Sequence, residues 1–375
     1  MASIRKRGNL WEYTVKYKDK DGNPKRKIKG GFVLKKEALE ASAILEKQIK
    51  DGFTVTEDIT LIDYYNHWLD TFKMGKHAPV TESRYKTIRK QLQGYFGVNQ
   101  KLTKLTRSDW QKFINDFGSN HARETVSKLN SYVRDMAKSA IADRIILFDF
   151  TDGVILTGNK GKNEKFKYLE ASDYKKLKEY VFKNASLDKI FNYIIAAGAM
   201  TGARYSEVLA LTWKDINFKE KTISINKSWD YSYTNQFKET KTPSSIRIIA
   251  IDSELVTLLK QLKKEQSNYF EGIERPVSIN EMVFLDKDLK LITDSAINKD
   301  LRNIEKKLNI YPVITYHGLR HTHVSYLISK GIDINYISKR LGHSNVAVTM
   351  RVYTHLLKEQ EIEQEQKTIM AMGQL

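Results

Sequence analysis

Near the N-terminus, apolar and polar side chains alternate with the period of a β-strand. Aromatic or aliphatic residues occupy the odd positions from 11 to 17, and polar residues occupy the even ones. A turn sequence at residues 21–24 leads to a second, basic strand at residues 25–29. Residues 35–50 have helical periodicity, with an expected buried stripe of Ala38, Leu39, Ala41, Ile44, Leu45 and Ile49. Residues 1–52 therefore predict a small three-stranded sheet backed by one helix.

The next hundred residues have the period of amphipathic helices. We expect Thr81 to cap the second of these helices and the sequence from Thr106 to Asp109 to cap the third. The fourth carries an apolar stripe that includes Val126, Val133 and Ala140. The predicted helices span residues 61–72, 79–96, 106–117 and 122–143. Residues 58–152 are thus predicted to form an all-helical domain.

A glycine-rich, polar segment follows, and residues 153–166 are expected to form an exposed linker. Residues 167–375 make up the largest predicted domain, which is mostly helical. Within it, residues 222–225 and 246–251 predict the two strands of one hairpin, separated by a protruding loop of 20 residues. The predicted fold class is therefore multidomain and mainly α, with a sheet-plus-helix domain, a helical domain and an α+β domain.

Charge points to a polyanionic partner. The chain of 375 residues has 63 lysines and arginines against 45 aspartates and glutamates, a net charge of +18. Residues 1–30 alone hold ten basic and three acidic side chains. Such a surplus is typical of nucleic-acid binding and less often of binding to anionic membranes. A flexible basic arm is the alternative for this segment, but its aromatic alternation favours a folded sheet.

Several function classes find no support in the sequence. The longest apolar uncharged run, residues 190–203, is 14 residues long, and a membrane span needs about 18. No signal peptide is apparent, and the chain has no cysteine, which fits a reducing, cytoplasmic compartment without proving it. Phosphate-binding loops of the Gly-x-x-x-x-Gly-Lys-Ser/Thr type, His-Glu-x-x-His and calcium loops are also missing, which argues against nucleotide-driven motors and metallonucleases.

Histidine is concentrated near the C-terminus, where five of the eight lie between residues 317 and 355. They occur in His317-Gly-Leu-Arg320-His321, in Leu-Gly-His343 and beside Tyr353. Further upstream, Arg204 stands at a predicted helix start with Glu207 three residues on, and the hairpin loop supplies Lys241. This set suits phosphodiester chemistry, since guanidinium groups neutralise nonbridging oxygens and a tyrosine hydroxyl can attack phosphorus.

In their order and spacing, these residues closely resemble the tyrosine recombinase (phage integrase) family of site-specific DNA recombinases. The three-part layout resembles integrases of temperate phages and conjugative transposons. The resemblance implies an arm-type DNA-binding domain in residues 1–52, a core-binding domain in 58–152 and a tyrosine-recombinase catalytic domain in 167–375. It also implies strand cleavage and rejoining through a 3′-phosphotyrosine and a Holliday junction, which integrates or excises a mobile element without a cofactor or metal.

The resemblance implies a catalytic set, with Tyr353 as nucleophile, Lys241 as proton donor and Glu207 orienting Arg204. The set is Arg204, Lys241, His317, Arg320, His343 and Tyr353. Lys238 is an alternative to Lys241, and Tyr316 and Tyr336 are alternatives to Tyr353. For His321 and His323 we expect packing or helix-surface roles. A helix-turn-helix is a further interpretation of residues 334–354, but the upstream arginines and lysine weigh against it.

Double-stranded DNA is the expected partner, bound at core and arm sites. Candidate DNA contacts in the two N-terminal domains are Arg5, Lys6, Arg7, Lys25, Arg26, Lys27, Arg84, Arg89 and Lys90. Family analogy implies a homotetramer on DNA, DNA-bending and excision proteins as further partners, and a C-terminal segment, residues 356–375, that docks onto a neighbour. The rival hypotheses are a noncatalytic DNA-binding regulator with the same fold and a topoisomerase-like relaxing enzyme.

Overall fold

The computed structural model describes residues 2–18, 22–50, 59–160, 168–240, 242–272, 281–347, 349–350, 353, 365, 368–370 and 372–373. The chain divides into two compact units, Met1–Gly161 and Lys162–Leu375, and each has its own cores. The expected docking segment, residues 356–375, lies outside the described residues except at six positions. In the part of the chain that the structure describes, no helix combines the length and apolar character needed to cross a membrane.

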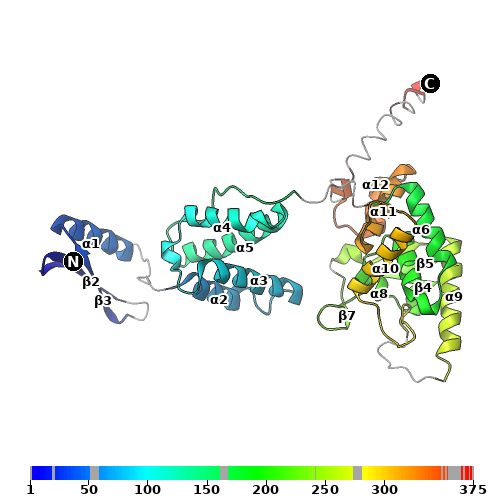
Figure 1. Cartoon of the computed structure of the whole chain (residues 1–375), viewed down its shortest axis with the longest axis horizontal. Coiled ribbons are helices and arrows are strands. Elements are labelled where there is room, and N and C mark those ends of the chain that lie inside the picture. The colour runs from blue at the N-terminus through cyan, green and yellow to red at the C-terminus, as the bar shows by residue number, and fades with distance from the viewer. Residues whose placement is uncertain are drawn as a thin grey trace. The chain divides into compact units, whose positions relative to one another are not determined.

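A three-stranded antiparallel sheet and one helix form the N-terminal module, as the alternation predicts (Figure 1). The strands are β1 (Ser3–Arg7), β2 (Leu10–Lys18) and β3 (Pro24–Phe32), and the helix is α1 (Lys35–Lys50). Tyr13 and Val15 of β2 pack against Leu45 of α1 and form the buried core.

Two details of this module differ from the prediction. Leu39 and Ile44 are 54% and 61% exposed, because α1 presents Ala38, Ser42 and Leu45 to the sheet instead. Glu12, expected on the polar face of β2, is buried and ion-paired with Arg5. The β2–β3 register shifts between Trp11 and Glu12, so the strict alternation of faces is broken there.

Four helices with a shared aromatic core follow: α2 (Leu61–Phe72), α3 (Pro79–Phe96), α4 (Arg107–Ser119) and α5 (Arg123–Ala142). Trp68, Trp110 and Phe150 are at most 1% exposed within it. Thr106 and Asp109 form the predicted capping box at the start of α4. Thr81 does not cap α3, which begins two residues earlier at Pro79 because proline is well suited to a first helical position.

The first half of the expected linker is partly exposed but packs on the helical unit. Val154 and Leu156 pack against the core of the helices, and the Gln111 side chain bonds to the Ile155 backbone. Asn159 pairs with the chain at the start of α5 in a parallel bridge. Residues 154–160 therefore belong to the helical unit, because Val154, Leu156 and several backbone groups find partners on it, whereas the Ile155 side chain is 75% exposed. Residues 161–167 lie outside the described residues.

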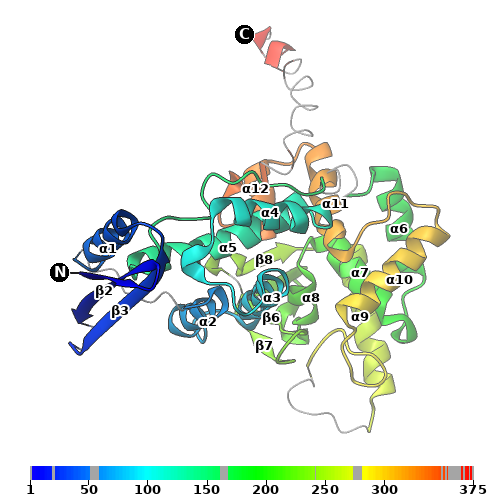
Figure 2. The same cartoon turned by 60° about the vertical axis from the view of Figure 1, so that its left-hand side comes forward.

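The second unit is built around α7 (Ile190–Thr201), in which ten residues are buried. Helices α6, α8, α9, α10 and α11 all contact α7 (Figure 2). Their bounds are α6 (Ala171–Lys183), α8 (Tyr205–Leu209), α9 (Ser253–Tyr269), α10 (Asp294–Lys307) and α11 (Tyr316–Ser329), and α12 (Ile334–Leu341) packs on α11. An apolar helix of this length is thus the core of the unit and not a membrane span.

The predicted hairpin is present as the antiparallel pair β5 (Thr222–Ile225) and β8 (Arg247–Ala250), in register Ile223 to Ile249. A short strand that the sequence did not predict, β4 (Ile216–Asn217), pairs with β5 on the side away from β8. The long connection between β5 and β8 contains a second strand pair, β6 (Ser228–Trp229) and β7 (Phe237–Lys238).

Candidate active site

Arg204 lies in a tight turn between two helices at the heart of the second unit. α7 ends at Thr201 and is capped by Gly202, whose φ of 67° is the left-handed conformation that favours glycine. Arg204 is the N-cap residue of α8, and Glu207 occupies the third position of that helix. The Glu207 carboxylate accepts the Arg204 backbone N–H at 2.9 Å and its Nη1 at 2.7 Å. The predicted pairing of these two residues is therefore present, and it fixes the guanidinium.

A second arginine, which the sequence analysis missed, holds Glu207 from the other side. Arg247 of β8 donates from Nη2 to Glu207 Oε2 at 2.9 Å, and the two side chains are 6% and 3% exposed. Arg247 also donates to the carbonyls of Ser245 and Arg340 at 2.7 Å each. Although burial alone raises the pKa of Glu207, its bonds to Arg247 and Arg204 lower it below the ordinary value. Glu207 is therefore held as a carboxylate.

Arg320 enters the same region from α11. Its side chain is 4% exposed, with Nη1 donating to the Gly202 carbonyl at 2.7 Å and Nη2 to the Leu341 carbonyl at 2.8 Å. Nη2 also lies 2.9 Å from His343 Nε2. A guanidinium only donates, so Nε2 accepts and the His343 Nδ1–H donates to Thr349 Oγ1 at 2.7 Å.

Both predicted histidines near Arg320 are kept neutral. Burial and the nearby Arg320 and Arg204 lower the pKa of His343 to about 4. The same three causes lower the pKa of His317. Burial and Arg204 also lower the pKa of Arg320 to about 9. Desolvation is the largest cause of all three shifts, and the neighbouring arginine charges add to it, although the His317 side chain itself is exposed at the surface. The arginine charges, not the desolvation, favour an anionic occupant.

Tyr353 meets this region through a histidine. Its Oη lies 2.6 Å from His321 Nδ1. The tyrosine is 3% exposed and packs in one apolar cluster with Val324 and Leu341. The two alternatives differ in environment. Tyr316 is buried under α7 and its hydroxyl donates to the Ile194 carbonyl, whereas Tyr336 is 52% exposed.

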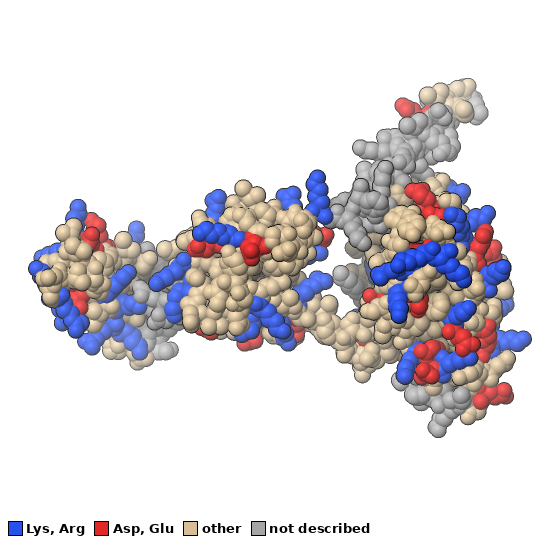
Figure 3. Space-filling model, viewed as in Figure 1, with Lys and Arg blue, Asp and Glu red and all other residues tan. Residues whose placement is uncertain are grey.

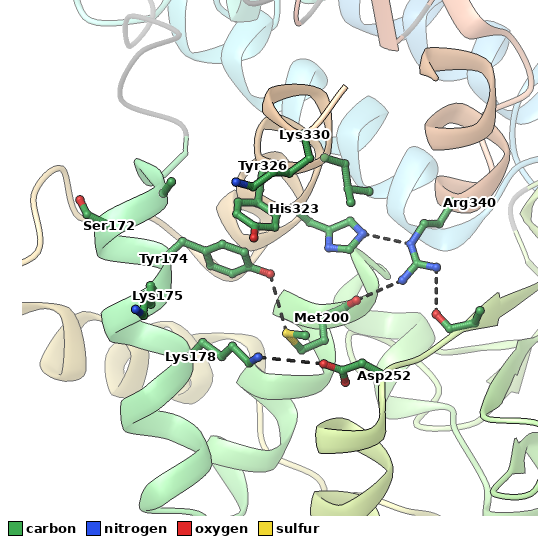
Figure 4. Close-up of a pocket in the computed structure, with 13 residues that line it drawn as sticks. Ser172, Tyr174, Lys175, Lys178, Met200, Asp252, His323, Tyr326, Lys330 and Arg340 are labelled. Carbon is green, nitrogen blue, oxygen red and sulfur yellow. Dashed lines mark hydrogen bonds and ion pairs between the residues drawn. The ribbon is translucent and has the colours of Figure 1, made fainter. Parts of the chain in front are cut away.

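The two histidines expected to have packing or surface roles have different environments. His323 packs as predicted: it is 5% exposed, its Nδ1 donates to the Ala199 carbonyl, and Nε2 accepts from Arg340 (Figure 4). Burial and Arg340 lower the pKa of His323 to about 3. A cavity of about 780 Å³ lies beside this pair. His321 instead contacts Tyr353, which its sequence position did not indicate.

Lys241, the expected proton donor, lies outside the described residues. Its neighbour Thr242 bonds to the hydroxyls of Ser244 and Ser245, at the base of the β5–β8 connection. The alternative, Lys238, lies on β7 within 3.6 Å of Asp230 and is about half exposed. Among the described residues, no group of three or more histidine, aspartate and glutamate side chains is placed to hold a metal ion.

The candidate DNA contacts lie in two surface groups. Arg5, Lys6, Arg7, Lys25 and Arg26 are exposed on the N-terminal sheet, and Lys27 beside them is half-buried. Lysine and arginine side chains are prominent on this module in Figure 3. The others lie on α3, where Arg84 and Lys90 are exposed and the half-buried Arg89 donates to Asn66 Oδ1 at 2.6 Å.

Comparison with known proteins gives two domain matches. Residues 167–360 match the model of the phage integrase family, and residues 3–49 match an arm DNA-binding domain. The integrase of Staphylococcus phage L54a is 26% identical over 350 residues, which cover 86% of this chain and 98% of that one.

Two solved structures share the fold. The Tn1549 transposon integrase in complex with a circular intermediate DNA has a TM-score of 0.67 at 18% identity, covering 79% of this chain and 95% of that one. A lambda integrase tetramer bound to a Holliday junction has a TM-score of 0.58 at 14% identity, covering 91% and 95%.

Proposed function

This chain belongs to the phage integrase family of tyrosine recombinases, and we propose that it cuts and rejoins DNA at specific sites through a phosphotyrosine at Tyr353. The observation that carries the proposal is the buried cationic cluster around Glu207. Arg204, Arg247 and Arg320 bring three positive charges against the single carboxylate of Glu207. The alternative hypothesis, a noncatalytic DNA-binding regulator, does not explain why such a cluster occurs together with a buried tyrosine hydroxyl.

A scissile phosphate fits the charge of this cluster. Arg204 is 32% exposed, so its guanidinium is open to a ligand while Glu207 fixes its orientation. In-line displacement at phosphorus concentrates negative charge on the nonbridging oxygens, and preorganised guanidinium groups lower the energy of that state. Arg320 and His317 are further donors for the same oxygens, and we assign them with Arg204 to transition-state binding. His343, expected as another donor, instead accepts from Arg320 at Nε2 and donates from Nδ1 to Thr349, so we propose that it positions Arg320.

In the proposed reaction, Tyr353 Oη attacks the phosphorus, and the bond from phosphorus to the 5′ oxygen breaks. The 3′ phosphate remains on the tyrosine, and Lys241 supplies a proton to the leaving 5′ oxygen. The phosphotyrosine keeps the energy of the phosphodiester bond, so the 5′ hydroxyl of another strand reverses the step without ATP. Rejoining to a partner strand makes the reaction a recombination.

We further propose that residues 1–52 bind arm DNA and that residues 58–152 and 167–375 bind the core site. The exposed basic side chains of the sheet and the arm-domain match support the first part. Four protomers on two sites, exchanging strands through a Holliday junction, are proposed by analogy with the lambda integrase tetramer. DNA-bending and excision proteins are the accessory partners expected with such an assembly.

Covalent trapping tests the function. The substrate is a nicked core-site DNA, with the site identified from the sequence that flanks the gene. Wild type is expected to give a covalent protein–DNA band on a denaturing gel and Tyr353→Phe none, while Tyr336→Phe keeps it because that ring is exposed. A band with Tyr353→Phe would show that another residue is the nucleophile. Plasmids with two sites or none then separate recombination from simple relaxation.

A further inference from the structure

The hydroxyl of Tyr353 is hydrogen-bonded to a histidine that the family resemblance does not include among the catalytic residues. His321 Nδ1 and Tyr353 Oη are 2.6 Å apart, and the ring centroids are 5.9 Å apart with an interplanar angle of 52°. This distance is that of a short hydrogen bond, and a neutral His321 with its proton on Nε2 accepts it at Nδ1 from the phenol.

The surroundings favour proton transfer along this bond. Tyr353 is 3% exposed among apolar side chains, so bulk water is a poor acceptor for its proton. A free tyrosine has a pKa near 10 and is almost wholly protonated at neutral pH. Attack on phosphorus therefore needs a base within hydrogen-bond distance of Oη, and His321 satisfies that condition.

His317, the other histidine on this face of α11, is a weaker candidate. Its ring is edge-on to the ring of His321, and the two ring centroids are 5.0 Å apart. Its side chain is exposed at the surface, yet desolvation of the ring and the charges of Arg320 and Arg204 lower the pKa of His317, so a second proton there is disfavoured. His317 is better suited to donating a hydrogen bond to a phosphate oxygen than to becoming a cation.

Building on the proposed function, we propose that His321 is the general base of the reaction. As Oη bonds to phosphorus, the phenol proton passes to His321 Nδ1 and the imidazole becomes a cation. The 5′ oxygen leaves with the electrons of its bond to phosphorus and takes its proton from Lys241. In rejoining, the 5′ hydroxyl attacks, its proton returns to Lys241, and His321 returns the phenol proton to Oη.

A purely structural role for His321 makes a different prediction, and two variants separate the two roles. His321→Asn keeps a hydrogen-bonding group near the position of Nδ1 but cannot take up a proton, whereas His321→Ala removes both functions. General-base catalysis contributes about 10²–10⁴-fold, so we expect both variants to cleave slower by that range. If the bond only holds the tyrosine in place, Asn cleaves nearly as fast as wild type.

The experiment is single-turnover cleavage of the nicked core-site DNA between pH 5 and 9. Wild-type cleavage is expected to slow toward the acidic end of this range, because a protonated His321 has no nitrogen left to accept the phenol proton. His321→Asn should be slow and lack this inflection, and added imidazole should partly restore His321→Ala. A wild-type rate in His321→Asn, or a slow variant that keeps the inflection, would overturn the proposal.

A modified substrate separates the base from the acid. When sulfur replaces the bridging 5′ oxygen, the leaving thiolate needs no proton, so Lys241→Ala should recover and His321→Asn should not. Recovery of His321→Asn would place His321 on the leaving-group side and overturn the assignment. Tyr353→Phe is run in parallel: adduct formation there means that the proposed function has failed, whereas without that adduct the rates of the His321 variants decide its role.

Discussion

Arg247 and Glu207, 40 residues apart in the chain, form a buried ion pair in which Nη2 lies 2.9 Å from Oε2. The pair links β8 to the start of α8 and completes the support of Arg204. Arg247 also donates a hydrogen bond to the Arg340 carbonyl near the end of α12, so this one guanidinium connects β8, α8 and α12.

We expect Arg247→Met to destabilise the protein and to stop cleavage. It leaves the Glu207 carboxylate buried with one partner fewer, and losing one member of a buried pair costs about 3–5 kcal/mol. Denaturant unfolding and the trapping assay measure the two effects. The exposed Lys219→Met should stay within about 0.5 kcal/mol of wild type. Equal stability of the two variants would refute the structural role of Arg247.

Gly202→Ala should perturb the site more than another glycine substitution of the same backbone type. A Cβ at Gly202, with φ of 67°, would lie 2.8 Å from His323 Cδ2 and 3.0 Å from Leu341 Cδ2. Gly272, with φ of 74°, has nothing within 4 Å of that position. Gly272→Ala should lower the free energy of unfolding by about 1–2 kcal/mol, the cost of a left-handed backbone at a residue with a Cβ. Gly202→Ala should lower it by clearly more and should also reduce cleavage. Similar losses in the two variants would contradict this packing.

Stability should depend on pH through Glu305. Its side chain is fully buried; Oε1 accepts the Ile314 N–H at 3.1 Å, and Oε2 has no partner among the described residues. Burial raises the pKa of Glu305 to about 8. The folded state then binds more protons than the unfolded state, so stability falls as pH rises from about 4.5 to 8, by at most about 1.4 kcal/mol per pH unit. Glu305→Gln should flatten the curve from unfolding titrations, and an unchanged curve would exclude Glu305 as its source.

The N-terminal sheet should account for arm binding. Deleting residues 1–52 is expected to abolish binding to arm sites while isolated core DNA is still cleaved. A triple alanine variant at Lys25, Arg26 and Lys27 should reduce the salt dependence of arm binding, by about 0.9 in the log–log slope for each phosphate that is no longer neutralised. Arm binding that survives the deletion would show that these residues are not the arm-binding domain.

Chelators should leave the cleavage rate unchanged. In the proposed reaction, Arg204, Arg320 and Lys241 would bring the positive charge that a magnesium ion supplies in metal-dependent phosphoryl transfer. Single-turnover cleavage with and without EDTA checks this. A chemical step that requires Mg²⁺ even after assembly on DNA would refute it.

Local patterns were enough to predict much of the fold. The bounds of α1 and α2 and the capping box at Thr106 follow from neighbouring residues alone. The face that a helix buries is a tertiary property, and this is why Leu39 and Ile44 were assigned to the wrong face of α1. Residues 154–160 were assigned to a linker because their glycines and polar residues do not reveal the contacts they make with α4 and α5.

The site was predictable only as far as its motif extends. Arg204 lies in the turn that follows α7, and Arg320 donates a hydrogen bond to the Gly202 carbonyl of the same turn, as their shared proposed role requires. Arg247 begins β8 and is followed by two isoleucines, and its partner Glu207 lies 40 residues earlier in α8, so only tertiary packing brings the two side chains together. The contact of His321 with Tyr353 depends on how the chain returns after α12, which no local sequence pattern encodes.

The N-terminal module has a very small core, and its buried apolar residues among those the structure describes are Tyr13, Val15, Ala38 and Leu45. A domain of this size rarely gains more than about 3–5 kcal/mol from its core. Any ligand that binds only the folded sheet therefore adds a large fraction of its stability by mass action. The module should therefore be folded more of the time when it is bound to DNA. Calorimetry should show that this module melts first and that its melting temperature rises when arm DNA is added. Without arm DNA, a protease should cleave this module before the other domains.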